Sequence, residues 1–86
     1  MKPRLLIDSS VLEFVGNLRK RDREFLRARF EAIRDFPGQH ADYRVQDETG
    51  REIDGHIAGR FAIIFWDDFA DRHVKILGIT WADKLT

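Results

Sequence analysis

The sequence lacks cysteine altogether, which excludes a disulfide framework, thiolate catalysis and cysteine-based zinc sites. It also lacks any apolar run near the roughly 20 residues that a membrane-spanning helix needs. Its first ten residues, MKPRLLIDSS, contain no signal-peptide core. These absences predict a cytoplasmic protein that has no membrane partner.

A glycine-rich phosphate loop is also missing, because Gly55 and Gly59 are followed by neither a lysine nor a helical pattern. The three histidines, His40, His56 and His73, fall in different predicted elements and lack the spacing of metal ligands. We therefore expect neither a cofactor nor a metal ion.

The residues that are present suit one folded domain over residues 1–86. A hydrophobic content of 43%, with seven Phe and two Trp, favours a packed core over disorder. The net charge is zero, yet residues 1–34 carry nine Lys/Arg against five Asp/Glu, and residues 35–86 carry six against ten. This asymmetry predicts a basic helical face and an acidic sheet edge or loop set, the alternative being two ordinary solvated faces.

The stretch from Arg51 to Thr80 holds three short apolar-rich runs separated by two turns, at Glu52–Ile57, Phe61–Trp66 and His73–Thr80. The middle run, FAIIFW, is apolar at every position, which predicts a central strand covered on both faces. Gly59 suits the first turn and a longer polar loop forms the second. We predict a three-stranded antiparallel meander.

The N-terminal half of the sequence predicts one strand followed by two helices. Arg4–Ile7 is a candidate strand, and Ser10 with Glu13 has the spacing of a capping box that opens a first helix. Asp22 is the expected N-cap of a second helix, which Pro37 and the glycine after it should stop.

Tyr43–Gln46 is a candidate extra strand before the meander. The predicted fold class is α+β: a two-layer domain in which an N-terminal strand and a helix hairpin pack on one face of an antiparallel sheet. The element order is β-α-α-β-β-β with one extra strand.

Alternation along Glu52–Ile57 puts Ile53 and Ile57 on one face of the sheet, and three polar side chains on the other. These three are Glu52, Asp54 and His56, and the cations expected near them are Arg44, Arg51, Arg60 and Lys75. Such a face suits general acid–base cleavage of a phosphodiester. The alternative is an ordinary wet sheet face with cross-strand ion pairs.

The order of elements, followed by GREIDGHIAGRFAIIFWDDFADRHVKILGI, resembles the RelE/ParE superfamily of bacterial type II toxins. Glu52–Ile57 matches the first strand of the family pattern, Gly59–Phe65 the turn and central strand, and His73–Ile79 the last strand. The chain departs from the pattern at Ala62, where the family commonly carries an arginine. It also has Thr80 and Trp81 in place of a late His-Arg pair.

The resemblance implies the toxin of a toxin–antitoxin system that inhibits translation by ribosome-dependent mRNA cleavage, with a cognate antitoxin, the ribosome and mRNA as partners. The residues assigned to cleavage under this hypothesis are Arg60, His56 and Arg51. Those assigned to nucleic-acid binding are Arg19, Lys20, Arg21, Arg23, Arg27 and Trp81. The alternatives are a non-catalytic ParE-like toxin that binds a protein target such as DNA gyrase, and a diverged toxin-like domain with only a protein partner.

Overall fold

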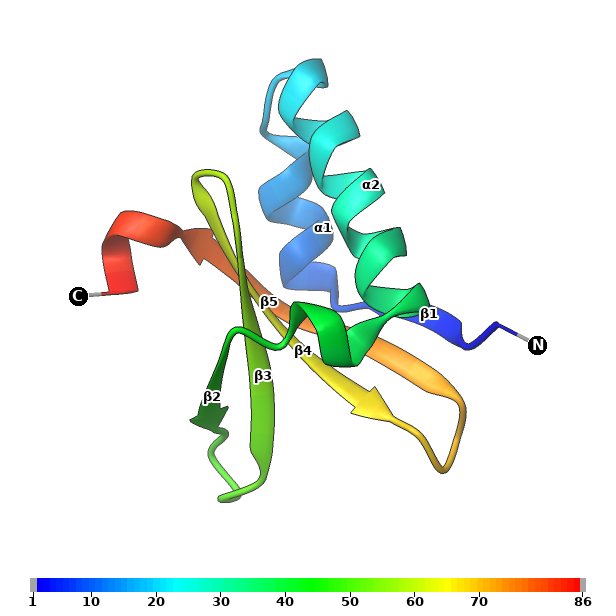
Figure 1. Ribbon diagram of the computed structural model, residues 1–86. Coiled ribbons are helices and arrows are strands. Elements are labelled where there is room, and N and C mark those ends of the chain that lie inside the picture. The colour runs from blue at the N-terminus through cyan, green and yellow to red at the C-terminus, as the bar shows by residue number, and fades with distance from the viewer. Residues whose placement is uncertain (1, 86) are drawn as a thin grey trace.

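The computed structural model describes residues 2–85 and forms two layers, a helix hairpin and a twisted sheet (Figure 1). The elements are β1 (Arg4–Ile7), α1 (Ser9–Gly16), α2 (Lys20–Asp35), the 3₁₀ turn η1 (Pro37–His40), β2 (Tyr43–Gln46), β3 (Glu52–Ala58), β4 (Phe61–Asp68), β5 (His73–Trp81) and the 3₁₀ turn η2 (Ala82–Leu85). This confirms the predicted α+β class, its element order and the extra strand. No helix within residues 2–85 is long and apolar enough to span a membrane.

The sheet runs in the order β1-β5-β4-β3-β2. The four strands from β2 to β5 pair antiparallel, as the meander predicts. The first strand differs from the prediction of an antiparallel sheet, because β1 pairs parallel to β5, with Arg4 opposite His73 and Ile7 opposite Ile76. The first strand of the chain, β1, and the last, β5, are therefore neighbours in the sheet and form its one parallel pair among the described residues.

The two helix starts lie earlier than predicted. Asp8, and not Ser10, caps α1, since the Asp8 carboxylate accepts a hydrogen bond from the Ser10 backbone N–H at 3.0 Å. Helix α2 begins at Lys20 with Arg19 as its N-cap, and Arg19 makes no side-chain capping bond. Asp22, the predicted cap, lies in the first turn instead. The predicted stop is confirmed, because α2 ends at Asp35 and Pro37 opens η1.

The core lies between the helices and the central strand. Leu26, Phe30 and Ile33 line the buried stripe of α2 and meet Phe61, Ile63 and Phe65 of β4. Cross-strand partners share a face, so His56, opposite Ile63, also points to the helix layer. The other face of the sheet carries Tyr43, which packs directly over Gly55.

Candidate nucleic-acid interface

The three residues assigned to cleavage lie in three different environments. Arg51 and Arg60 flank opposite ends of the seven-residue strand β3, which at about 3.3 Å per residue separates them by roughly 23 Å. His56 lies between them and only 6% of it is exposed. The structure therefore does not bring Arg60, His56 and Arg51 together around one phosphodiester.

Arg51 lies against an aromatic ring on the open face of the sheet. Its guanidinium carbon is 3.9 Å from the Trp66 ring centroid, and its Nη2 is 3.0 Å from the Asp47 carboxylate. Lys75 approaches the same ring, with its Nζ 4.8 Å from the centroid. Lys75 also pairs with Asp68 at 3.3 Å. Both cations are thus engaged by an aromatic ring and by a carboxylate.

His56 is held in a closed cluster with Arg29, His40 and Asp42. Its Nδ1 is 2.8 Å from the Asp42 carboxylate and its Nε2 is 3.0 Å from an Arg29 guanidinium nitrogen. Because a guanidinium only donates, Nε2 must accept and Nδ1 must carry the proton. The ring of His40 packs edge-on against His56, with 5.0 Å between centroids.

This environment keeps His56 neutral. Burial lowers the pKa of His56, and the hydrogen bond to Asp42 opposes that shift only in part. Burial also raises the pKa of Asp42, but hydrogen bonds from the Ile57 N–H and from His56 outweigh it, so the net pKa is lowered. A neutral His56 with both ring nitrogens occupied joins α2 to β3.

The predicted polar face of β3 exists, but only one of its expected cations is there. Arg44 of β2 bonds the Glu52 carboxylate at 2.8 Å and lies 3.1 Å from Asp54. Arg51 and Lys75 are on the opposite face with Trp66, and Arg60 is in the turn after β3. At this position the face carries cross-strand ion pairs, which is the alternative that the sequence left open.

Arg60 lies instead beside a hollow of about 400 Å³ at the other end of the molecule. The hollow is bordered by the α1–α2 loop, the β3–β4 turn and the end of β5, which gather on one side of Figure 1. We call this the basic hollow, and its polar and aromatic lining is Asn17, Arg19, Arg21, Asp22, Arg60 and Trp81.

The basic hollow is held by contacts between elements distant in sequence. An Arg60 guanidinium nitrogen bonds the Asp22 carboxylate at 2.8 Å, which ties the β3–β4 turn to the first turn of α2. Gly59 supplies the positive φ of 57° that this turn needs. Trp81 stacks on Phe61 with 5.0 Å between centroids, so its ring is fixed in place.

The residues assigned to nucleic-acid binding divide between two surfaces. Arg19, Arg21 and Trp81 line the basic hollow. Arg23 and Arg27 lie further along α2 beside an apolar groove. Lys20 is exposed and 4.0 Å from Glu24. Whether these residues bind RNA stays a prediction.

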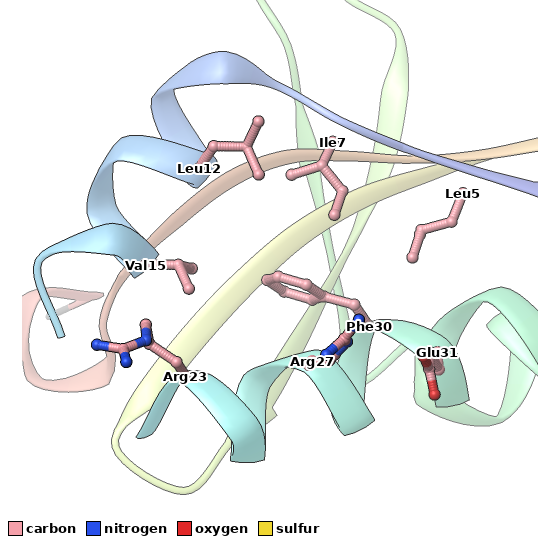
Figure 2. Close-up of a pocket in the computed structure, with 8 residues that line it drawn as sticks. All are labelled: Leu5, Ile7, Leu12, Val15, Arg23, Arg27, Phe30 and Glu31. Carbon is pink, nitrogen blue, oxygen red and sulfur yellow. The ribbon is translucent and has the colours of Figure 1, made fainter. Parts of the chain in front are cut away.

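The apolar groove has a volume of about 420 Å³ and opens between α1, β1 and α2 (Figure 2). Leu5 and Ile7 enter it from β1, Leu12 and Val15 from α1, and Phe30 from α2. Two arginines and Glu31 stand at its α2 side. Leu12 is 58% exposed, so the groove presents apolar surface to solvent.

Within residues 2–85, no three or more histidine, aspartate or glutamate side chains lie close enough to hold a metal ion.

No model of a known protein family matches the sequence, and no curated protein matches it. Solved structures do match. A chain of the archaeal RelE–RelB complex from Pyrococcus horikoshii OT3 superposes with a TM-score of 0.76 at 15% identity, covering 94% of this chain and 96% of that one. A mutant of the E. coli toxin RelE in the free state gives 0.67 at 13% identity, over 99% and 88%.

The fold is the RelE fold. At these identities the likeness concerns the arrangement of the backbone, and it confirms the fold that the sequence resemblance implied. Ala62, where the resemblance leads one to expect an arginine, is fully buried in β4. The position therefore supplies no charge to a ligand in this protein.

Sequence reasoning missed two members of the closed cluster in this RelE fold, Arg29 and Asp42. Arg29 is one of the five arginines of α2, and Asp42 lies in a segment whose sequence predicts a loop. A weak signal was present, because Arg29 is one residue from Phe30 on the buried stripe. Asp42 carried no such signal.

Proposed function

We propose that this protein is the toxin component of a type II toxin–antitoxin pair. The observation that carries the proposal is the apolar groove in a RelE fold, a surface left open on a small domain. A chain with the same fold has been solved in a RelE–RelB complex. By analogy, the partner here is a cognate antitoxin protein that covers the groove.

The groove suits an amphipathic segment of such a partner. Its floor consists of aliphatic and aromatic side chains, and Arg23 and Arg27 offer two cations against the single carboxylate of Glu31. Leu12, at the edge of the groove, is more than half exposed, so a partner that covers it would bury the most apolar surface there. An apolar helix or strand with acidic residues at its margin fits this surface.

We infer that the toxin acts on translation by engaging RNA, and ribosome-dependent cleavage of mRNA is the specific form that the RelE fold favours. Arg60 is the one assigned catalytic residue beside the basic hollow. Cleavage also needs a group that moves a proton, and His56 is turned inward with both ring nitrogens occupied. His56 therefore has no ring nitrogen free to take up or release a proton at a substrate.

The separation of Arg60, His56 and Arg51 supports a second candidate, inhibition by binding alone. A ParE-like toxin of this kind binds a protein target such as DNA gyrase, and it needs no preassembled catalytic group. A diverged domain whose only partner is the antitoxin is the minimal form of the same candidate.

Induced expression separates these functions. Growth, protein synthesis and DNA synthesis are followed by pulse labelling, and the 5′ ends of mRNA are mapped before and after induction. Loss of protein synthesis with new mRNA ends supports ribosome-dependent cleavage. Loss of DNA synthesis first supports the gyrase candidate, and unchanged growth contradicts the toxin proposal.

The antitoxin is tested with the product of the neighbouring open reading frame. Co-expression should rescue growth and yield a co-purifying complex. Leu12→Arg places a charge at the edge of the groove and should abolish both effects. Phe69→Arg, an equally drastic change at a side chain that is 85% exposed in the β4–β5 loop, is the matched control. Loss of the complex with Phe69→Arg alone would move the antitoxin surface away from the groove.

A further inference from the structure

The basic hollow has an unbalanced charge. Three guanidinium groups line it, from Arg19, Arg21 and Arg60, and Asp22 is the single carboxylate in the lining. The formal charge of this lining is thus three minus one, or +2. Among residues 2–85, no carboxylate lies within salt-bridge distance of Arg19 or Arg21. Arg19 and Arg21 thus border the hollow without a carboxylate partner among the described residues, and their guanidinium donors are available to an anion.

Arg60 is held in a way that leaves it available. Its Nη2 bonds the Asp22 carboxylate at 2.8 Å, yet the Arg60 side chain is 61% exposed, while that of Asp22 is 15% exposed. Its guanidinium carbon is also 5.4 Å from the centroid of Trp81. The fork of Arg60 is positioned by Asp22 and Trp81, and much of it still faces solvent.

Trp81 gives the hollow an aromatic wall. Its ring is fixed by stacking on Phe61 and by a tilted contact with Phe14, with 5.6 Å between those centroids. The loop opposite is also fixed, because the Asn17 amide donates to the Glu13 carbonyl at 3.0 Å. The Arg23 guanidinium donates to the Leu18 carbonyl at 2.6 Å. The ring and the loop that border the hollow are therefore ordered before a ligand binds, which lowers the entropic cost of binding.

Guanidinium groups beside an aromatic ring match the two ends of one nucleotide. Phosphate is bound by arginine forks, and a base stacks on an aromatic side chain in proteins that hold single strands. A volume of about 400 Å³ accommodates one such unit, within the roughly 300–1,000 Å³ of small-ligand sites. A duplex presents its bases stacked and paired, so a single strand is the form that fits.

We propose that the basic hollow binds one nucleotide of single-stranded RNA, with its phosphate on Arg19, Arg21 and Arg60 and its base against Trp81. This inference rests on the proposed action on RNA and names the anchoring site for it. The incoming phosphate competes with Asp22 for Arg60. Neutralising Asp22 therefore strengthens binding, although it removes an ion pair from the free protein.

The test uses the purified full chain with a six-nucleotide single-stranded RNA as the probe. Trp66→Phe leaves Trp81 as the one tryptophan, so its fluorescence reports on the hollow. We expect saturable quenching that weakens as salt rises from 50 to 200 mM, in proportion to the phosphates contacted. In the unmutated chain, the Trp81 indole N–H resonance should shift as RNA is added, and the Trp66 resonance should not.

Four variants decide the assignment. Arg60→Gln, Arg19→Gln and Arg21→Gln should each weaken binding by about tenfold or more, as expected for a charge-assisted hydrogen bond. Asp22→Asn should tighten it. Arg44→Gln is the matched control, because it also removes an exposed arginine that is paired with a carboxylate, at the far end of the sheet. It should leave the affinity unchanged.

Several results would overturn the proposal. One is that Arg44→Gln weakens binding as much as Arg60→Gln, since the contact would then be diffuse. Another is that inorganic phosphate at equal concentration shifts Trp81 as strongly as RNA, which reduces the hollow to a simple anion site. Weaker binding by Asp22→Asn would contradict the competition between Asp22 and phosphate. Melting curves of every variant exclude loss of the fold as the cause.

The same variants separate this inference from the proposed function. If the unmutated protein arrests growth but Arg60→Gln binds RNA with unchanged affinity, the nucleotide site is refuted and the toxin proposal is not. RNA binding that depends on Arg60, without growth arrest on induction, refutes the toxin proposal and leaves the site.

Discussion

Two arginine-containing regions of this molecule differ in how much of their chemistry is already used. In the closed cluster, both ring nitrogens of His56 are bonded and the ring is nearly inaccessible. In the basic hollow, Arg60 is mostly exposed and two further arginines face open space. Residue types that suggest catalysis can therefore serve the fold alone when they face inward, and an open cavity is needed before they serve a ligand.

The largest expected effect concerns the sheet face opposite the closed cluster, where Tyr43 packs over Gly55. A Cβ atom at Gly55 would lie 2.1 to 2.5 Å from ring atoms of Tyr43. Gly55→Ala should therefore lower the free energy of unfolding by about 3 kcal/mol, the upper end of the usual cost of overpacking. Urea denaturation measures it, and the double variant with Tyr43→Ala should recover part of the loss. An unchanged midpoint would mean that this region is looser than its contacts indicate.

The next effect concerns Asp42, which accepts hydrogen bonds from His56 and from the Ile57 N–H, each at 2.8 Å. Asp42→Ala leaves these donors without their acceptor and should cost about 1–2 kcal/mol of unfolding free energy. Glu48→Ala, in the exposed β2–β3 turn, is the control and should cost much less. If both variants lost the same unfolding free energy, the closed cluster would not stabilise the fold.

The pH dependence of stability sharpens the comparison further. The pKa of His56 is lower in the folded protein than its ordinary value of 6.5, because burial disfavours the imidazolium. The unfolded chain then binds more protons, so stability is complete above about pH 6.5 and falls as the pH drops below it. Protonation also turns Nε2 into a donor that faces the Arg29 donor.

Melting temperatures between pH 8 and 5 measure this effect. His56→Gln should flatten the decline over that range, while His73→Gln, at the half-buried start of β5, should preserve it. If the melting temperature of His56→Gln still fell with pH to the same extent, another group would be responsible for the proton uptake.

The smallest effect on stability is expected for a substitution in the basic hollow. Arg60→Gln breaks an exposed ion pair and should change the unfolding free energy by less than about 1 kcal/mol. Arg44→Gln should change it by a similar small amount. The two variants should differ only in RNA affinity and in growth arrest. A large loss of stability in Arg60→Gln would make the Arg60–Asp22 pair part of the fold, like the closed cluster.

Much of the fold was predictable from the sequence, because hydrophobic period is local information. Phe61–Trp66 is apolar at every position and became part of the central strand, although helices cover it on one face and not on both as predicted. Tyr43–Gln46 was predicted with the bounds that the structure has. The helix starts were less predictable, since Asp8, Ser10 and Asp22 are all good caps by residue type. Which of them caps depends on where the preceding strand and loop leave the chain.

The sequence by itself determined the type and order of the helices and strands, the division into helical and sheet layers, and the excess of cations in its first 34 residues. Only the tertiary structure decided that β1 pairs parallel with β5, that His56 turns inward to Arg29, and that Arg60 meets Asp22, 38 residues away. The physical reason is that side-chain period specifies which face is buried, while contacts between distant residues depend on how the buried faces pack together.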